Sequence, residues 1–596
     1  MEPLKQFQQR QQQFEQQAQK YQLKYNQFGW LRVFLFLTGF LGTYFLFQSQ
    51  GALAMAVGGL LFLLAFLFSL KAHNRIEYQR DHFRFLSYIN RDESARLHNE
   101  FIRDETGEAY TEPNHFYTSD LDIFGKHSVF KLLNRTRTLG GAQKLAAWLK
   151  HAETAPEIRL RQEAVTELTP RLDWRQMLEA NAMHYKEVNQ STHSLLQWMA
   201  EPEIVSQSFG MRLAKWLPMI TIPLTVAWLA GFLSLQVLFL FILVHLFVLG
   251  RIFKAVKDTC DKTNTISQTL MAYANIIKVV EKEKFTAAKL QALQHAFVDK
   301  HTTASKAIQQ FAIILRNLNY RNNPYFYSLI GIISLWDLQF FIRTEQWKKQ
   351  HQQALINWFE AVAEWESLNS LAGYAFSNPE FIMPILSPEP MELQAEHLGH
   401  VLIRKDKRVT NHVQLSGLGK TLVITGSNMS GKSTFLRTVA VNAVLALAGA
   451  PVCAKSFTIS VIRVFTSMRT QDSLEESVSS FYAELKRLKQ LIEQVDNPEP
   501  VLYFLDEILK GTNSQDRHHG AKSLIKQLHQ HPSSGFISTH DLELGRMADE
   551  HPDFVHNYSF NSELINEELF FDYTLREGIC RSFNASQLMK QIGIEV

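Results

Sequence analysis

The sequence predicts a multidomain protein: a mainly α-helical region that contains two apolar helical hairpins, followed by a C-terminal α/β domain. Three observations lead to this fold class. Residues 33–70 and 216–250 contain no Asp, Glu, Lys or Arg. From 252 to 372, apolar residues recur among charged ones at helical spacing. From about 380 onward, short apolar runs alternate with turns and with a helix-like run at 435–450, a pattern typical of α/β domains.

The first uncharged stretch predicts a transmembrane hairpin at 31–70. A single helix over 33–70 would be about 57 Å long, nearly twice the roughly 30 Å hydrocarbon core of a bilayer. The segment Gln48-Ser-Gln-Gly51 interrupts the stretch with polar residues and a glycine. We therefore expect two spans, one at 31–48 and one at 52–70.

The second uncharged stretch predicts another transmembrane hairpin, at 217–250. It is broken near 231–236, which gives spans near 217–232 and 235–250. A helical hairpin buried in a soluble core is the alternative, and stretches that are apolar on every side argue against it. A third apolar run, at 325–341, is short and contains an aspartate, so we expect it to be a buried core helix.

Basic residues flank both hairpins and are missing from both connecting turns. The flanking residues are Lys20, Lys24, Arg32, Lys71, Arg75, Arg80, Arg212, Lys215, Arg251, Lys254 and Lys257. By the positive-inside rule, this pattern predicts a multi-pass protein of the cell (inner) membrane, with both termini and all soluble parts in the cytoplasm. The few, scattered cysteines fit a reducing compartment. The net charge of +3 gives no sign of a nucleic-acid partner.

The rest of the sequence divides around these hairpins. Residues 1–30 form a polar, Gln-rich arm, which we expect to be a solvated cytoplasmic helix. Residues 71–120 form a charged linker that is helical at first. Residues 121–375 predict a helical core and lever domain, interrupted by the second hairpin. Residues 376–596 predict the α/β domain. No cleavable signal sequence is expected, because the first apolar stretch follows a long polar arm.

The most specific motif of the chain is Gly426-x4-Gly431-Lys432-Ser433, the pattern of a phosphate-binding loop (P-loop, or Walker A motif). An apolar strand at 421–424 leads into the motif and a helix-like run leads out of it, as such a loop requires. Glycines let backbone N–H groups turn toward phosphate oxygens, and the helix N-terminus attracts the same anion. The residues expected to bind ATP are Gly426, Ser427, Asn428, Met429, Ser430, Gly431, Lys432, Ser433 and Thr434. Lys432 would reach the β- and γ-phosphates, and the Ser433 hydroxyl would ligate Mg²⁺.

Two further strands end in residues that suit a nucleotide site. The apolar run at 501–505 reads as a buried strand and ends in Asp506-Glu507. Asp506 would hold Mg²⁺, and Glu507 would orient and deprotonate the attacking water. A third run, at 536–539, ends in His540, which would reach the γ-phosphate or the catalytic water. A histidine at a strand end is more often structural, so this role depends on its neighbours.

These motifs resemble the ATPase domain of the MutS family of DNA mismatch repair ATPases, which belongs to the wider class of ATP-binding-cassette (ABC-type) nucleotide-binding folds. The resembling segments are the loop at 426–433, the stretches at 506–514 and 538–541, and the segment at 471–484, which is similar to the family's signature segment. Residues 121–149 resemble the start of the family's core and lever domain, and 575–585 resemble the segment that closes the ATPase domain.

The resemblance implies more than the residues themselves show. It implies Mg²⁺-dependent ATP hydrolysis by a homodimer with two composite sites, in which Ser479 of one chain reaches the γ-phosphate on the other. It also implies that Asn428 and His540 sense the γ-phosphate in cis, and that DNA is a partner. Nothing in the chain resembles the family's mismatch-reading domain with its Phe-x-Glu element, so selectivity for mismatches is not expected. Basic residues along 278–310 are interleaved with acidic ones and are typical of a solvated helical face.

The sequence therefore predicts a membrane-anchored, MutS-like ATPase that couples ATP hydrolysis to a conformational change of a dimer, in a process of the DNA-repair type. One alternative is an ABC-like membrane ATPase that acts on a solute or on a membrane protein partner. Against it, the Leu-Ser-Gly-Gly-Gln signature is missing, and His245 is the sole ionisable residue in the uncharged stretches. A second alternative is a membrane tether that binds ATP without turnover, against which Lys432 and Glu507 argue.

Overall fold

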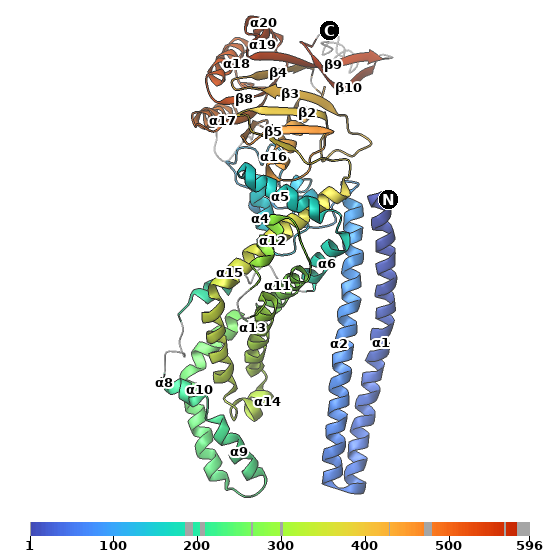
Figure 1. Ribbon diagram of the computed structural model, residues 1–596, viewed down its shortest axis with the longest axis vertical. Helices are drawn as coiled ribbons and strands as arrows, with labels where there is room; N and C mark the ends of the chain where they lie inside the picture. The colour runs from blue at the N-terminus through green and yellow to red at the C-terminus, as the bar shows by residue number, and fades with distance from the viewer. Residues whose placement is uncertain are drawn as a thin grey trace.

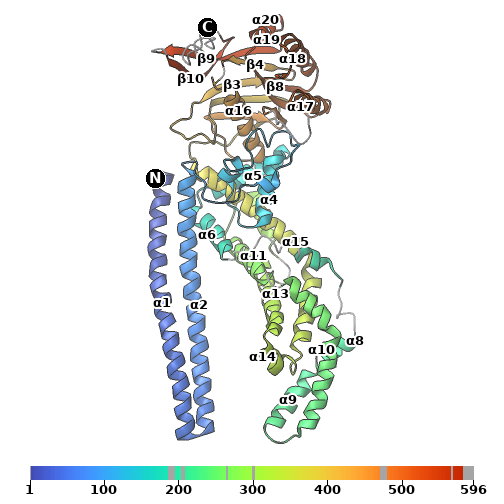
Figure 2. The ribbon, with the colours of Figure 1, turned by 180° about the vertical axis from the view of Figure 1, so that it is seen from behind.

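The computed structural model describes residues 2–184, 195–202, 209–263, 266–298, 302–427, 429–469, 480–565 and 568–580. The molecule is elongated (Figure 1). The α/β domain lies at one end, and two helical hairpins extend to the other. Both hairpin turns point to the same end of the molecule, as the front and back views agree (Figure 2).

The first hairpin consists of two long antiparallel helices, α1 (Pro3–Gln50) and α2 (Ala52–Arg96). They are joined at Gly51, whose φ of 82° lies in the region that glycine adopts at no steric cost. The predicted hairpin and its break are therefore present. Its distal half is covered with exposed apolar side chains, among them Trp30, Phe34, Phe40, Phe45, Leu61 and Phe68.

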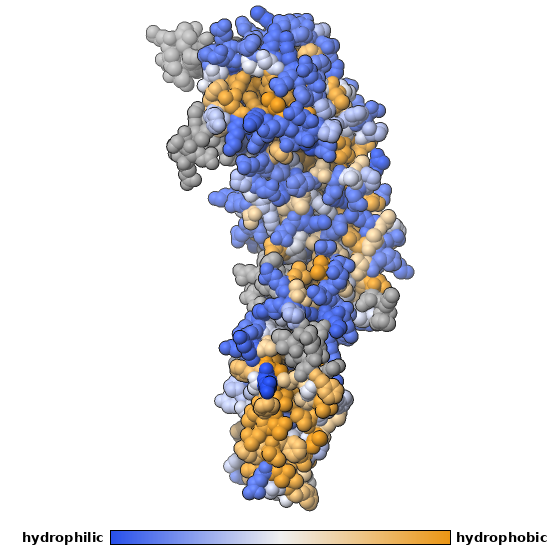
Figure 3. Space-filling view, turned by 90° about the vertical axis from the view of Figure 1, so that its left-hand side faces the viewer, coloured by the Kyte–Doolittle hydropathy of each residue, from blue (hydrophilic) through white to orange (hydrophobic). Residues whose placement is uncertain are grey.

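The second hairpin follows the short helix α8 (Phe209–Ala214) and consists of α9 (Pro218–Leu229) and α10 (Leu235–Thr263). In the part of the chain that the structure describes, three helices are long and apolar enough to cross a membrane: Pro3–Ser49, Ala54–Arg96 and Leu235–Thr263. Helix α9 is apolar but shorter than the span predicted at 217–232, because Pro218 begins it and the turn at Gly231 follows it closely. Figure 3 shows apolar side chains gathered at the end where α9 and α10 lie.

The lever region is built from α11 (Ile266–Glu281), α12 (Ala288–His295), α13 (Ala304–Leu318) and α15 (Trp336–Ser377). Helix α15 has 42 residues, so it is about 63 Å long. It begins near the second hairpin and ends at the α/β domain (Figure 1).

The prediction of one buried helix over 325–341 is wrong. The 3₁₀ turn η2 (Asn319–Asn322) is followed by α14 (Pro324–Phe326) and by a π-helical turn, η3 (Tyr327–Gly331). The side chain of Asn323 caps α14. Leu335 then adopts a left-handed conformation, with φ 47°, and separates these turns from α15. Tyr325 is exposed, whereas Leu335 is fully buried.

Four shorter helices connect the first hairpin to the α/β domain: α3 (Val129–Leu133), α4 (Leu139–Lys150), α5 (Ala155–Leu168) and α6 (Leu172–Met183). A 3₁₀ turn, η1 (Glu108–Tyr110), precedes them. The arm at 1–30 is helical but is not solvated throughout, because Phe7 is buried with its ring centroid 5.6 Å from that of Phe376. Helix α2 likewise ends in the core, where Glu93 forms a buried ion pair with Arg135 at 2.6 Å.

The α/β domain contains a six-stranded sheet with the order β10-β9-β4-β8-β7-β6. Its strands are β4 (Thr421–Gly426), β6 (Arg463–Ser467), β7 (Val501–Asp506), β8 (Ser533–Thr539), β9 (Val555–Ile565) and β10 (Glu568–Glu577). All pairs are parallel except β10 with β9. The strands predicted at 421–424, 501–505 and 536–539 are β4, β7 and β8.

A second, mixed sheet has the order β1-β5-β2-β3, from β1 (Ile385–Ser387), β2 (Glu392–Leu398), β3 (Asn411–Ser416) and β5 (Ser456–Ser460). The helices of the domain are α16 (Lys432–Ala448), α17 (Ser480–Val495), α18 (Ser514–His529), α19 (Leu542–Gly545) and α20 (Met547–Glu550). Helix α16 is the helix that the sequence predicts after the phosphate loop.

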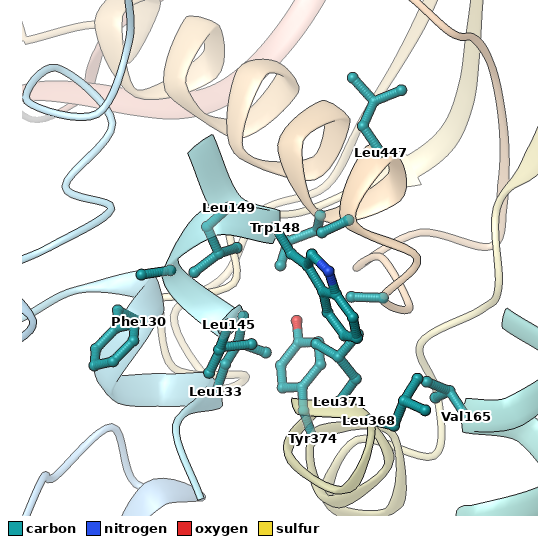
Figure 4. Packing of buried hydrophobic residues seen from close by; sticks show 14 of the residues in the cluster. Phe130, Leu133, Leu145, Trp148, Leu149, Val165, Leu368, Leu371, Tyr374 and Leu447 are labelled. Atoms are coloured by element: carbon teal, nitrogen blue, oxygen red, sulfur yellow. The ribbon is translucent and has the colours of Figure 1, made fainter. Parts of the chain in front are cut away.

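One buried cluster joins the helical region to the α/β domain. Figure 4 shows Trp148 of α4 beside Leu371 and Tyr374 of α15, with Leu447 of α16 across from them. All four side chains are buried. Helix α4 packs against both α15 and α16 and so links the two helices through this core.

Candidate nucleotide-binding site

The strand order brings the predicted site residues to one edge of the six-stranded sheet. Strands β4, β8 and β7 are adjacent and parallel, so their carboxyl ends lie side by side. They lead into the phosphate-loop motif, His540 and the Asp506-Glu507 pair, respectively. In open α/β sheets, ligands bind outside this edge.

The turn after β4 has the backbone geometry of a phosphate loop. Gly431 adopts φ 103° immediately before α16, and Met429 adopts φ 69°. A Cβ atom on Gly426 would lie 2.8 Å from the Phe560 carbonyl oxygen and 2.8 Å from Ser430 Oγ, so only glycine fits there. The fold thus requires glycine at position 426, where the motif also has glycine. Asn428, which is predicted to sense the γ-phosphate, lies outside the described residues.

Lys432 is buried at the start of α16. Its Nζ donates hydrogen bonds of 2.9 Å to the carbonyl oxygens of Gly426 and Ser427. Burial lowers the pKa of Lys432, against the opposing effect of the Glu507 and Asp506 carboxylates. The side-chain oxygens of Ser427 and Ser430 are buried, and neither has a hydrogen-bond partner among the described residues. Buried donors without partners are costly, and an anion in the loop would satisfy them, so these residues fit a bound polyphosphate.

Two oxygen-bearing side chains, Asp506 and Ser433, are predicted to hold Mg²⁺. Asp506 ends β7, and its Oδ1 accepts a hydrogen bond from the Ser538 hydroxyl of β8. Ser433 lies in the first turn of α16 and lines the same cavity as Glu507. Carboxylate and hydroxyl oxygens are hard ligands of the kind that Mg²⁺ takes, so the donor set fits the ion. Thr434 also lines this cavity.

Glu507 is half-buried and adopts a left-handed backbone with φ 51°. Its Oε1 lies 3.6 Å from His540 Nδ1, and its Oε2 lies 3.2 Å from Lys510 Nζ. Burial raises the pKa of Glu507, but Lys510, His540 and Lys432 outweigh it and hold the pKa below its usual range. The structure thus brings the two predicted catalytic residues together and favours the ionised carboxylate.

A residue without an assigned role in the sequence analysis, Glu484, holds the loop that carries Glu507. Its carboxylate accepts hydrogen bonds from the backbone N–H groups of Leu509 and Lys510, the second at 3.1 Å. Leu509 is also left-handed, with φ 60°. Glu484 lies in the first turns of α17 and is the last residue of the signature-like segment. That segment, including Ser479, lies outside the described residues except for its end at 480–484.

A cavity of about 410 Å³ adjoins the phosphate loop. Away from the loop it is lined by Leu398, His400, Ile403 and Val409, among others. Burial lowers the pKa of His400 to about 4, so its imidazole is neutral at pH 7. Apolar side chains beside a neutral ring suit a planar base. The sequence analysis missed these residues because they come from separate segments with no common motif.

Asn411 fixes Tyr573 over the phosphate loop. Its side-chain Nδ2 donates to the Tyr573 carbonyl oxygen at 3.1 Å, and its Oδ1 accepts from the Leu575 N–H at 2.7 Å. Tyr573 is left-handed, with φ 54°, at a register shift of β10. A Cβ atom on Gly431 would lie 3.0 Å from Tyr573 Cδ1, so the ring rests on the loop. The cavity is therefore closed on this side by β10.

The sheet order, the loop geometry and the acid pair define an α/β domain whose candidate site has residues that fit a phosphate-bearing ligand. The family model for MutS domain V matches residues 422–594. This part of the chain is therefore similar to MutS domain V, at low identity to the relatives below.

Curated relatives match the C-terminal part of the chain. The DNA mismatch repair protein MutS of Natronomonas pharaonis is 29% identical over 236 residues, which cover 39% of this chain and 27% of the relative. MutS of Thermotoga maritima is 27% identical over 249 residues, 41% of this chain and 31% of the relative. Endonuclease MutS2 of Thermotoga neapolitana is 25% identical over 238 residues, 40% of this chain and 30% of the relative. The chain thus spans under a third of the length of these relatives.

Proposed function

We propose that this protein is a membrane-anchored MutS-like ATPase in which ATP binding and hydrolysis open and close a dimer. The observation that carries the proposal is the convergence of the phosphate loop, Asp506, Glu507 and His540 at the carboxyl edge of one parallel sheet. The domain match and the printed names of the relatives support the same family of activity. ATP is the proposed substrate and Mg²⁺ the proposed cofactor.

Each residue of the site has a defined task in this proposal. Lys432 exchanges its two carbonyl partners for the β- and γ-phosphate oxygens, and the hydroxyls of Ser427 and Ser430 donate to the same anion. Ser433 and Asp506 hold Mg²⁺, which offsets the negative charge of the phosphates when bound. The ionised Glu507 accepts a proton from the water that attacks the γ-phosphate.

His540 takes a supporting role beside this carboxylate. Its Nδ1 lies on the Glu507 side, at 3.6 Å, so its other ring nitrogen is available to donate toward a γ-phosphate oxygen. Together, the two side chains align the water and the transferred group, which is the main contribution that proteins make to phosphoryl transfer. Ser479 from the second subunit would complete the site in trans, as the family resemblance implies.

The proposed output of the ATPase is movement at the apolar end of the molecule. Helix α15 shares a buried core with α16, which begins in the phosphate loop, and α4 packs against both helices. From this core α15 extends to the second hairpin. The exposed apolar surfaces of both hairpins are what a lipid environment would cover. The positive-inside pattern puts the ATPase domain in the cytoplasm, where ATP is present.

DNA is a weaker part of the proposal. It is supported by the printed names of the relatives. The lever itself adds little, because Lys289 is engaged with Glu157 at 3.1 Å and with Glu364 at 2.7 Å. A lysine neutralised by two carboxylates contributes little to phosphate binding. Any DNA bound is therefore expected to be held without selectivity for mismatches.

ATP hydrolysis by the purified full chain in detergent tests the proposal. We expect Lys432→Ala to lose ATP binding, whereas Glu507→Gln binds ATP normally and hydrolyses it roughly 10² to 10⁴ times more slowly, because only proton transfer is lost. Glu499→Gln is the matched control, since Glu499 is an exposed carboxylate of the same domain that is paired with Arg463. Equal rates for the wild type and Glu507→Gln would refute the assigned base, and no Mg²⁺-dependent turnover at all would favour the tether that only binds ATP.

A further inference from the structure

A groove of about 730 Å³ lies between the start of the second hairpin and the start of α15. Its walls are formed by Lys215, Trp216, Met219 and Ile222 before and along α9, and by Gln339 and Arg343 on α15. Gln339 donates a hydrogen bond to the Lys215 carbonyl oxygen and thereby ties the two walls together. The floor continues into a buried cluster that includes Ala214 and Ile342.

The lining of the groove changes from basic residues at one end to apolar residues toward the other. Helix α9 runs away from the α/β domain and α15 runs back toward it (Figure 1). The end nearer the α/β domain therefore carries Lys215 and Arg343, while Met219 and Ile222 follow in the direction of the hairpin turn. Both apolar residues are exposed, at 66% and 48%.

The charge of the groove is positive and has no counter-ion of its own. No Asp or Glu lines the groove. Among the residues that the structure describes, no carboxylate forms an ion pair with Lys215 or Arg343. Lys215 Nζ lies 5.2 Å from the ring of Trp216, and Arg343 Cζ lies 4.9 Å from the ring of Phe340. The two cations therefore have aromatic neighbours but no neutralising anion, which leaves them free to bind one.

We propose that this groove binds an anionic phospholipid. The headgroup phosphate lies between Lys215 and Arg343, and the part of the acyl chain next to the headgroup lies along Met219 and Ile222. The inference rests on the membrane anchoring proposed above, which would place Trp216 at the headgroup level where tryptophan is enriched. Basic pockets at the cytoplasmic ends of membrane helices recognise anionic headgroups. Because Arg343 belongs to α15, the bound lipid would tie the base of the lever to the bilayer.

Native mass spectrometry of the full chain in detergent tests the groove. The probes are phosphatidylglycerol, phosphatidylcholine with the same acyl chains, and inorganic phosphate. We expect one phosphatidylglycerol per chain to be retained in preference to phosphatidylcholine, and each of Lys215→Gln and Arg343→Gln to lower this affinity roughly fivefold. Arg251→Gln is the matched control, because Arg251 also flanks the second hairpin but does not line the groove. It should leave the affinity unchanged.

The possible outcomes distinguish failure of the proposed lipid site from failure of the proposed membrane anchoring. Extraction of membranes at high pH first establishes whether the chain is integral, and release of the chain would overturn the anchoring and the lipid site together. An integral chain with no headgroup preference, or with equal losses for Arg251→Gln and Arg343→Gln, would overturn the groove alone. Retention of inorganic phosphate as tightly as phosphatidylglycerol would overturn the lipid assignment and leave a phosphate site.

Discussion

Replacement of Glu484 by glutamine tests whether α17 positions the catalytic loop. The carboxylate accepts from two adjacent backbone N–H groups, Leu509 and Lys510, in a loop where both Glu507 and Leu509 are left-handed. Phe481, one turn earlier in α17, packs closely against Gly511. A Cβ atom on Gly511 would lie 2.5 Å from the Phe481 Cβ. The loop is therefore held in an otherwise disfavoured conformation by one helix.

The size of the effect follows from the hydrogen bonds. Bonds to a charged acceptor contribute about 1.5–3 kcal/mol and neutral ones about 0.5–1.5 kcal/mol, and a glutamine amide accepts through only one of its two terminal atoms. Glu484→Gln should therefore destabilise the catalytic placement of Glu507 by about 1.5 kcal/mol, which is roughly a tenfold loss in kcat. The KM for ATP should change little, because the phosphate loop is untouched.

Steady-state ATP hydrolysis with a thermal unfolding control measures this effect. Glu493→Gln is the matched variant, because Glu493 is exposed on the same helix and pairs only loosely with Lys489, at 3.7 Å. The reasoning would be refuted if Glu484→Gln and Glu493→Gln turned over ATP equally fast. It would also be refuted if, for Glu484→Gln, kcat fell and KM rose by the same factor while the melting temperature decreased. That result would indicate general loss of structure and not lost positioning of Glu507.

Four other measurements address the pH dependence, assembly, topology and DNA. Lys510→Met removes the largest influence that lowers the Glu507 pKa, so the acid limb of the ATPase profile, which lies below the usual glutamate range in the wild type, should move to higher pH. An unchanged limb would contradict Glu507 as the titrating base. Mixed Lys432→Ala and Ser479→Arg chains should regain one working site per dimer, above the sum of the separate mutants. A cysteine at Gln50 should react with an impermeant thiol reagent in intact cells, and no reaction would contradict the first hairpin. Binding to duplex DNA should fall steeply with salt and change less than about tenfold with a mismatch, and a larger preference would reveal a reading element.

The strands β4, β7 and β8 and the helix α16 were predictable because the signals for them are local. Glycine positions, an apolar strand before them and a helix after them are contiguous in the sequence, and each dictates its own backbone conformation. The same holds for the first hairpin, where a polar break with Gly51 provides the turn. Burial of β7 was predictable as well, since Val501 to Leu505 are apolar without alternation, as a strand covered on both faces requires.

The remaining features depend on contacts between distant segments. No local sequence pattern predicts the hydrogen bond from Asn411 to the Tyr573 carbonyl or the hydrogen bonds that Glu484 accepts from the loop after β7. The same is true of the burial of Phe7 beside Phe376. Each of these contacts joins residues that are far apart in the sequence, so the pattern of a single segment cannot predict it. The break at Leu335 was missed for a related reason. Leucine rarely adopts a left-handed conformation, and here its complete burial stabilises it.

The continuity of α15 determines how the two ends of the molecule communicate. Its 42 residues form one helix, with no proline and with Gly373 as its sole glycine, which lies near the end in the core. Sharp helix kinks arise mainly at prolines and similar breaks, so we expect this helix to transmit displacement along its length. A rotation of one degree at the core beside α16 would move the far end by about 1 Å over its length of about 63 Å. The turns before Leu335 and the groove at Arg343 lie at that far end, where this displacement would be largest. Because α15 contacts α10 near that end, small closures of the ATP site would become ångström-scale shifts of the second hairpin.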